Sequence, residues 1–331
     1  MKKGLISILL PFKNSELYFK DCLDSIIDQS EGHWELIAIN DHSKDKSMEI
    51  IRDYSFKDGR IKVFENTGNG IIDALNTAYS NSQGEFIHRM DSDDIMPKRK
   101  LEELKKLLHK KGKGYVSTGM VKYFSKNDIS VGYKKYQSWL NDINQMGMQW
   151  ENIYKECVIA SPAWMIHRDD FENCEAFRSD LYPEDYDLVF RMYKSALKVI
   201  SSTEIVHLWR EHRERTSRNS KHYQQKAFFN LKVHHFLKNE IRDENLIVFA
   251  SGLKAKMLGQ ILLDREVQFE LISQNKDKSK SDLKKEIEKL LRDRQNSKYI
   301  IAIESKAAKR QLKSQFSEFN KKENIDYFNF S

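Results

Sequence analysis

Three aspartates fall within four positions of the chain, in the stretch DSDD at 91–94. They come directly after EFIHRM (85–90), an apolar stretch typical of a buried strand. Carboxylates this close repel one another and raise each other's pKa unless a positive charge lies between them. A helix cap needs only one acid, so the cluster favours a hard divalent cation such as Mg²⁺ or Mn²⁺, which prefers oxygen ligands.

A second acidic group, Glu184, Asp185 and Asp187, opens a stretch with apolar residues at helical spacing up to Leu197. These acids are equally typical of a helix N-terminus, where negative charge is favourable, and of acid–base catalysis. Further along, the segment 206–223 is dense in His, Arg and Trp. A solvated basic surface is the default interpretation of such a run, although a diphosphate would need a run like it.

Alternating strands and helices are expected to position these residues. Aliphatic stretches predict strands, and amphipathic stretches predict helices, in the order 5–10, 15–29, 35–40, 46–54, 61–64, 70–80 and 85–90. This alternation predicts an α/β fold with a mostly parallel sheet flanked by helices. Ligands of such sheets gather outside the carboxyl ends of the strands. The polar residues that follow the first, second and fourth strands should therefore be neighbours: 11–14, Asn40 and Asp41, and 91–94.

The stretch NDHSKD at 40–45, taken alone, is more typical of a turn and helix cap than of a site. Its place after a predicted strand is what links it to the aspartate cluster.

The composition is that of a globular protein. Of the 331 residues, 40% are hydrophobic and 32% are charged, and the net charge is +7 with a sequence pI of about 9.0. Because both signs are interspersed, we expect a well-solvated surface and no nucleic-acid partner, while phosphorylated ligands and an anionic membrane face stay open. Three cysteines without CxxC spacing indicate reduced thiols in the cytoplasm.

The N-terminal apolar run stops at Pro11, too short for a signal peptide, and no run approaches the ~18 residues of a membrane span. We therefore expect a cytoplasmic chain that is soluble, or peripheral at the inner face of the membrane.

Seven motifs occur in an order that resembles a family 2 glycosyltransferase of the glycosyltransferase A fold. They cover about residues 4–222 and are PFKNSE (11–16), NDHSKD (40–45), GIIDALN (70–76), RMDSDD (89–94), SPAWMIHRDDF (161–171), PEDYDL (183–188) and LWREH (208–212). A lone DxD is weak evidence, whereas seven motifs in the expected order are strong evidence.

The resemblance implies an inverting transfer of a sugar from a nucleotide-diphosphate sugar to an acceptor hydroxyl, in the synthesis of a cell-surface polysaccharide or glycoconjugate. The acceptor would be a saccharide or a lipid-linked molecule. In this family an acid after the second strand binds the nucleotide base, which implies Asp41 with Asn40 beside it. The family usually has two acids there, so Asn40 is a departure.

The same resemblance implies the reacting groups. Asp91 and Asp93 correspond to the acids that hold Mg²⁺ or Mn²⁺ on the diphosphate, and Asp94 to a residue that orients them. Asp185, with Glu184 beside it, corresponds to the base that deprotonates the acceptor. His212 corresponds to a group that reaches the metal or diphosphate, and Arg210 to one that offsets the leaving-group charge. Further nucleotide-sugar-binding residues implied by the motifs are Pro11, Asn14, Glu16, Asp73, Arg89 and Ser92.

A second alternating pattern begins after residue 222. A helix is predicted over 223–241, followed by strands and helices at 245–252, 253–263, 267–273, 281–293, 299–304 and 305–319. This tail resembles the Rossmann-like domain that follows the transferase in some family members. We therefore expect a catalytic domain at 1–222, a connecting helix at 223–243 and a Rossmann-like module at 244–331.

The module should not bind NAD. Ala250, Gly252 and Ala255 stand where a G-x-G-x-x-G fingerprint would lie, and Ser273 stands where an acid would bind the ribose. We expect a structural or partner-binding module.

Three other functions fit less well. A nucleotidylyltransferase needs a glycine-rich loop after its first strand, and LPFKNSE (10–16) has no glycine. A haloacid-dehalogenase-type phosphatase has its DxD after its first strand, not its fourth. A catalytically inactive sugar-nucleotide-binding protein is disfavoured by the intact acids, and only turnover excludes it.

The donor sugar, the acceptor and the oligomeric state are not indicated by the sequence. An acceptor pocket is expected in the stretch 120–157, where aromatic rings either stack on sugars or pack: Tyr123, Tyr133, Tyr136, Trp139 and Trp150.

Overall fold

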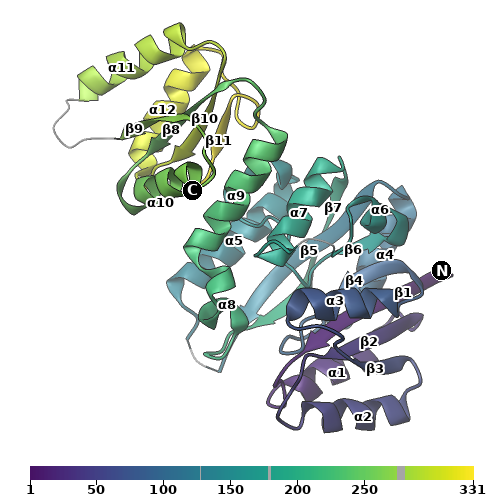
Figure 1. Cartoon of the computed structure of the whole chain (residues 1–331). Coiled ribbons are helices and arrows are strands. Elements are labelled where there is room, and N and C mark those ends of the chain that lie inside the picture. The colour runs from purple at the N-terminus through teal and green to yellow at the C-terminus, as the bar shows by residue number, and fades with distance from the viewer. Residues whose placement is uncertain (127, 178–179, 274–279) are drawn as a thin grey trace. The chain divides into compact units, whose positions relative to one another are not determined.

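The structure, a computed structural model, describes residues 1–126, 128–177, 180–273 and 280–331 (Figure 1). Contacts within the chain divide it into two compact units. Unit 1 comprises residues 1–149 and 158–218, and unit 2 comprises residues 150–157 and 219–331. The helix expected as a connection after residue 222 therefore falls within unit 2.

Unit 1 contains one sheet, whose strands, within the described residues, follow the order β3-β2-β1-β4-β6-β5-β7. β6 runs antiparallel to both of its neighbours, and the other pairings are parallel. The predicted mostly parallel α/β fold is confirmed. The strands are β1 (Lys2–Phe12), β2 (Trp34–Asn40), β3 (Ile61–Glu65), β4 (Gly84–Arg89), β5 (Tyr115–Phe124), β6 (Met165–His167) and β7 (Lys198–Arg210).

The longer helices of unit 1 pack against this sheet through buried apolar residues. In α1 (Phe19–Ile27), for example, Phe19, Cys22, Leu23 and Ile26 are buried at helical spacing. β2 is buried at every position, which requires cover on both faces of the sheet. The other helices are α2 (Ser47–Lys57), α3 (Ile71–Ser80), α4 (Lys100–Lys111), α5 (Val131–Met146), α6 (Arg168–Asn173), α7 (Glu184–Lys194) and α8 (Thr216–Asn219), the last of which contains the division between the units.

The register of the central strands brings three loops to one edge of the sheet. Phe12 at the end of β1 lies opposite Asn40 at the end of β2. Leu9 of β1 lies opposite Arg89 at the end of β4, and its carbonyl accepts the Met90 N–H at 3.0 Å. The loops after β1, β2 and β4 therefore begin side by side, as predicted.

Unit 2 contains a second parallel sheet in the order β11-β10-β8-β9. Its strands and helices occur where the sequence predicts them, and its likeness to a Rossmann-like module stays a prediction. The elements are the short helices η1 (Trp150–Asn152) and η2 (Lys221–Tyr223), then α9 (Gln225–Asn239), β8 (Asn245–Ala250), α10 (Gly252–Leu263), β9 (Phe269–Ser273), α11 (Lys280–Asp293), β10 (Ser297–Ala302), α12 (Lys306–Glu318) and β11 (Tyr327–Asn329).

The elements β5, α6 and β7 were not predicted from the sequence, and two further segments differ from the expectation. The helix predicted from residue 15 begins at Phe19, because the Ser15 carbonyl accepts the N–H groups of Tyr18 and Phe19 in a turn. The stretch 120–157, expected to be made of loops, contains the sixteen-residue helix α5. No described helix has the length and apolar character needed to cross a membrane.

Candidate active site

Asp41, directly after β2, is held by three donors. Its Oδ1 accepts the Asn66 amide at 2.7 Å and the Gly70 N–H at 2.9 Å, and its Oδ2 accepts Lys13 Nζ at 3.1 Å. Burial alone would raise the pKa of Asp41, but these hydrogen bonds outweigh it and hold the pKa below its ordinary value. The side chain is therefore a fixed, ionised acceptor at the carboxyl edge of the sheet.

The side chain of Asn40, at the end of β2, is hydrogen-bonded within the protein on both of its polar atoms. Its amide donates to Glu65 Oε2 at 2.9 Å, and its carbonyl oxygen accepts the Ser43 N–H at 3.0 Å. Asn14 and Glu16 accept the N–H groups of Lys44 and Lys46 at 2.8 and 3.0 Å. Asn14 and Glu16 therefore join the loops after β1 and β2, while Asn40 joins its loop to the end of β3. Whether these three residues also contact a ligand stays a prediction.

Arg89, at the end of β4, connects the two acidic groups of the sequence. Its Nε donates to Asp91 Oδ1 at 3.0 Å, and its guanidinium donates to Glu184 Oε1, also at 3.0 Å. Arg89 and Glu184 are both buried, whereas the Asp91 side chain is 26% exposed. The guanidinium thus offsets two carboxylates that lie 93 positions apart in the chain.

Asp185, in the first turn of α7, has a pKa well above that of an ordinary aspartate. Burial and the neighbouring charge of Glu184 raise the pKa of Asp185 to about 7, while Arg89 and the Tyr186 N–H, which Asp185 Oδ1 accepts at 2.8 Å, oppose the rise. Asp187, two residues on, forms an ion pair with Arg191 at 2.8 Å. Two acids of one helix turn therefore differ: Asp187 is paired within the helix, and Asp185 is poised near neutral pH.

Asp93 faces the segment after β7. Its Oδ2 lies 2.8 Å from His212 Nε2, and its carbonyl accepts Arg210 Nε at 2.7 Å. Burial alone would raise the pKa of Asp93, but the His212 hydrogen bond and the charge of Arg215 hold it below its ordinary value. The structure therefore brings together the predicted residues Asp93, Arg210 and His212.

Arg210 is also held by aromatic rings. Its guanidinium carbon lies 4.7 Å from the ring centroids of both Tyr18 and Phe124, and the group donates to Asp21 Oδ2 at 2.9 Å. Such packing fixes the cation beside the aspartate cluster.

Asp94 points into the core instead of toward a ligand. Its two oxygens meet the Arg210 N–H at 2.7 Å and His207 Nε2 at 2.9 Å, and Lys100 Nζ lies 3.2 Å from His207 Nδ1. Lys100 also donates to the Pro162 carbonyl at 2.6 Å. Burial, with the charges of Asp93 and Asp91, raises the pKa of Asp94 well above its ordinary value.

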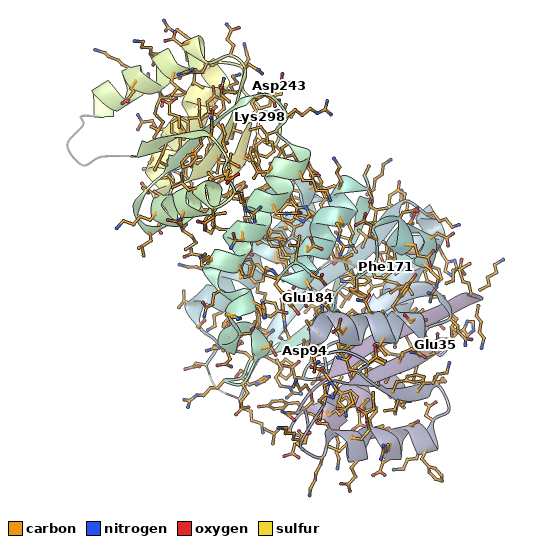
Figure 2. All side chains as sticks on the ribbon, viewed as in Figure 1. Glu35, Asp94, Phe171, Glu184, Asp243 and Lys298 are labelled. Carbon is orange, nitrogen blue, oxygen red and sulfur yellow. The ribbon has the colours of Figure 1, made fainter. Side chains whose placement is uncertain are left out.

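Lys100 and His207 form the buried base of this arrangement. Both side chains are almost completely inaccessible, and burial lowers the pKa of Lys100 to about 7. An ammonium group can only donate, so a protonated Lys100 places the imidazole proton of His207 on Nε2, facing Asp94. A chain of contacts therefore runs from Lys100 to His207, from His207 to Asp94 and from Asp94 to the backbone N–H of Arg210. Figure 2 labels Asp94 and Glu184, which are two of the buried carboxylates of unit 1.

Asp91 and Asp93 fit a divalent cation that is shared with a ligand. Both carboxylates are about a quarter exposed, at 26% and 27%, and His212 adds an imidazole beside Asp93. Within the described ranges, no group of three or more His, Cys, Asp or Glu side chains is arranged to hold a metal ion. Mg²⁺ characteristically takes one or two carboxylates and completes its shell with water and substrate phosphates. The donor set therefore suits an ion held between protein and diphosphate.

The remaining predicted residues lie around the same edge. Ser92 Oγ is 2.7 Å from Ser15 Oγ, and Asp73 accepts the Asn69 N–H at 2.8 Å at the start of α3. Pro11 lies in β1 opposite Ile39. Asp73 packs so closely that a Cβ on Gly68 would lie 2.1 Å from its carboxylate, so its carboxylate shapes the loop before α3.

The aromatic residues expected at an acceptor pocket are distributed between the units. Tyr123 stacks on Trp209 with centroids 5.0 Å apart, and Tyr136 stacks on Trp139 at 5.8 Å. Trp150 belongs to unit 2. Tyr123 is buried and packs, whereas Tyr136 and Trp139 are partly exposed.

Sequence reasoning missed several residues of the site. Lys13 and Asn66, which hold Asp41, and Lys100 and His207, which hold Asp94, were not singled out for these roles. Lys13 lies inside a motif and was therefore within reach of the sequence. The other three depend on side-chain contacts across at least 25 positions of the chain.

Comparison with known proteins identifies the family. The family model described as "Glycosyl transferase family 2" matches residues 7–174, which include Asp41, Asp91 and Asp93 and end before α7. Among curated relatives, the putative teichuronic acid biosynthesis glycosyltransferase TuaG of Bacillus subtilis is 35% identical over 120 residues, covering 35% of this chain and 47% of the relative. The chain spans less than half of the length of the first curated relatives that it matches.

Solved structures show the same fold. Residues 1–349 of TarS from S. aureus, in complex with UDP-GlcNAc, superpose with a TM-score of 0.56 at 17% identity, covering 78% of this chain and 71% of that one. The mannosyltransferase PcManGT from Pyrobaculum calidifontis, in complex with GDP-Man and Mn²⁺, gives a TM-score of 0.52 at 18% identity over 70% of this chain and 63% of that one. At this identity the likeness concerns the fold alone.

Proposed function

Because the chain belongs to glycosyl transferase family 2, we propose that it moves a sugar from a nucleotide-diphosphate sugar to an acceptor hydroxyl. The observation that carries this proposal is the gathering of Asp41, Asp91, Asp93 and Asp185 around one edge of the sheet, where burial and hydrogen bonds shift the pKa values of three of them in different directions. Asp41 and Asp93 have lowered pKa values, and Asp185 has a raised one. Binding and proton transfer require such a division of roles.

Asp41 is proposed to bind the nucleotide base. Its carboxylate accepts three hydrogen bonds from the protein, which leaves acceptor capacity for an N–H of the base. Because Lys13, Asn66 and Gly70 fix its position, little side-chain freedom is lost on binding. The occupied amide of Asn40 leaves the preferred base to be found by experiment.

Asp91 and Asp93, with His212 beside Asp93, are proposed to hold Mg²⁺ or Mn²⁺ against the diphosphate. The ion, when bound, would act as a Lewis acid that stabilises charge on the departing diphosphate. PcManGT, a structural neighbour, was solved with GDP-Man and Mn²⁺, which supports this assignment. Arg210, held between Tyr18 and Phe124, is proposed to offset the same charge.

Asp185 is proposed to be the general base. In an inverting transfer the acceptor hydroxyl attacks the anomeric carbon opposite the diphosphate, and a base must take its proton. Asp185 is partly buried beside Glu184, and its pKa is raised to about 7, which favours acceptance of the acceptor's proton. Glu184 is tied to Arg89 at 3.0 Å and is proposed to tune Asp185 and not to react.

The wider setting follows from the relatives. TuaG is named for teichuronic acid biosynthesis, which supports a role in cell-surface polysaccharide synthesis with a saccharide or lipid-linked acceptor. We propose that residues 1–222 form the catalytic domain, that 223–243 connect it to the tail, and that 244–331 form a Rossmann-like module without a dinucleotide site. A cytoplasmic location, peripheral at the membrane, is part of the same proposal.

A donor screen tests the function before the acceptor is known. The full chain with Mn²⁺ is mixed with UDP-, GDP- and dTDP-sugars, and thermal unfolding is followed. One donor class should raise the unfolding temperature in the wild type and not in Asp93→Ala. Release of the nucleoside diphosphate should then occur in the wild type and not in Asp185→Asn. A shift without any release, over a panel of saccharide and lipid-linked acceptors, would favour an inactive sugar-nucleotide-binding protein, and no shift with any donor would refute the proposal.

A further inference from the structure

Unit 2 contains a group of lysines that the transfer reaction does not use. Five of them, called the lysine cluster, come from the segment 150–157 and from helices α9, α10 and α12: Lys155, Lys232, Lys254, Lys309 and Lys313. Four separate segments therefore contribute positive charge to one region of this unit.

The lysine cluster lies at the carboxyl end of the parallel sheet. Lys232 Nζ donates to the carbonyls of Lys155 at 2.6 Å and Phe330, which follows β11, at 3.2 Å. Lys309 Nζ donates to the carbonyl of Ser331, whose hydroxyl in turn donates to the carbonyl of Ile303 after β10 at 3.1 Å. Lys254 lies in the first turn of α10, directly after β8.

This end of the sheet is where ligands of parallel sheets bind. β8 and β10 are neighbours, but the chain continues from β8 to β9 on one side and from β10 to β11 on the other. A crevice forms outside the carboxyl ends of two strands whose connections diverge in this way. The lysine cluster occupies that position.

The lysines are close enough to affect one another. Burial, together with the charges of Lys254, Lys155 and Lys313, lowers the pKa of Lys309 to about 8. Burial likewise lowers the pKa of Lys232 to about 8, with Lys254 and Lys309 adding to the effect against an opposing contribution from Glu156. Like charges held together destabilise the folded chain unless an anion lies among them.

Few carboxylates in the described part of the chain neutralise this charge. Glu323 pairs with Lys313 at 2.6 Å and approaches Lys155 at 3.9 Å. Glu304, which is 72% exposed, approaches Lys254 at 3.9 Å. Among the described residues Lys309 has no Asp or Glu side chain within ion-pair distance, so the five lysines share two side-chain carboxylates at that range and a net positive charge remains.

We propose that the lysine cluster binds a phosphorylated ligand, through a phosphate monoester or diester group. Ammonium groups are strong donors to phosphate oxygens and match a compact, multiply charged anion. The first turn of α10 adds backbone N–H groups beside Lys254, and its Ser251 cap leaves these groups free of a side-chain hydrogen bond. In this proposal the lysines of unit 2 bind the phosphate, whereas a dinucleotide-binding fold uses a glycine-rich loop whose backbone approaches it closely.

Calorimetry of the full chain with inorganic pyrophosphate tests the site. EDTA is present, so that metal-dependent binding at Asp93 does not contribute, and Asp93→Ala should bind the probe as the wild type does. The double variant Lys254→Gln, Lys309→Gln should bind at least tenfold more weakly, and Lys254→Arg, Lys309→Arg should retain binding. The matched control is Lys285→Gln, Lys289→Gln on the exposed face of α11, which should change the affinity less than twofold.

A parallel experiment identifies the source of the phosphate. Vesicles containing phosphatidylglycerol are sedimented with the wild type and with the glutamine double variant, whose unfolding temperature is checked first. Vesicle binding that the variant loses would assign the site to a lipid headgroup, and pyrophosphate binding alone would assign it to a soluble phosphate. If neither probe binds, or if the α11 control loses as much affinity as the cluster variant, the proposal is wrong. Donor binding at Asp93 is measured separately with Mn²⁺, so the two proposals succeed or fail independently.

Discussion

Replacing Asp185 with asparagine should stabilise the folded chain above neutral pH while removing the proposed base. Burial and the charge of Glu184 raise the pKa of Asp185 from 3.8 to about 7. The folded state therefore holds the proton more tightly than the unfolded state does. In the wild type, stability must fall as the pH rises from about 4 to about 7, whereas an asparagine does not titrate.

The magnitude follows from the shift. A difference of about 3 pKa units corresponds to about 4 kcal/mol, at 1.36 kcal/mol for each unit. The advantage of Asp185→Asn should be absent below about pH 4, reach about 1.5 kcal/mol near pH 5 and approach 4 kcal/mol near pH 8. Loss of the favourable interaction with the α7 N-terminus subtracts about 0.3–1 kcal/mol.

The assay is urea unfolding of the wild type and the variant across this pH range, in EDTA so that no metal alters the titration. Asp187→Asn is the matched control, since it makes the same change two residues further along α7. Asp187 is buried and paired with Arg191 at 2.8 Å, so that variant should lose on the order of 2–4 kcal/mol at neutral pH.

The two interpretations of the α7 acids predict opposite signs. If Asp185 serves only as an ionised carboxylate that stabilises the N-terminus of α7, Asp185→Asn should be destabilised by about 0.5–2 kcal/mol at every pH above 5. A destabilised Asp185→Asn, or a stability difference that does not grow with pH, would refute the argument that Asp185 is a base poised near neutrality.

Three further predictions concern the surroundings of the site. Lys100→Met should destabilise the chain by roughly 2–4 kcal/mol in urea unfolding, because it removes the buried ammonium group beside His207 and Asp94. The control Lys98→Met, at an exposed lysine, should change stability by less than about 0.5 kcal/mol. Similar effects of the two substitutions would contradict the buried role of Lys100. Asp41→Ala should weaken binding of the nucleoside diphosphate at least tenfold in calorimetry without changing its metal dependence, and unchanged affinity would remove Asp41 from the base site. NAD should bind the full chain no more tightly than inorganic pyrophosphate does, and a micromolar Kd, about −8 kcal/mol, would contradict the absence of a dinucleotide site.

The strands and helices were largely predictable because each shows its own periodicity. β2 contains the apolar run 36–39, and α1 and α4 carry apolar stripes at helical spacing, so local sequence and burial agree. The shared edge followed from these elements, since parallel strands place their carboxyl ends together. Asp41 and the 91–94 cluster were found in this way.

Several elements of unit 1 were not predicted, and α5 and β6 show why the local pattern is insufficient. α5 was missed because its exposed face and its aromatic residues, among them Tyr136 and Trp139, are also typical of a binding loop. β6 has three residues and is a strand only because β4 and β5 lie on either side of it. Its antiparallel direction is set by tertiary pairing, which no short stretch encodes.

The contacts that tune the site were also out of reach. Nothing in the sequence indicates that Arg89 joins Asp91 to Glu184, or that Lys100 is buried when most lysines are exposed. Buried charges of this kind are decided by partners that are distant in the chain. The sequence therefore indicated which acids to examine, and the structure was needed to distinguish their electrostatic states.

The central claim is that the acids at the carboxyl edge of the unit 1 sheet hold a nucleoside diphosphate through a divalent cation. Isothermal titration of the wild type with the nucleoside diphosphate of the selected donor, in Mn²⁺ and then in EDTA, tests it most directly. Binding should be present in Mn²⁺, at least tenfold weaker in EDTA, and equally weak in Asp93→Ala under both conditions. Equal affinity with and without the metal, or an undiminished signal in Asp93→Ala, would contradict the account.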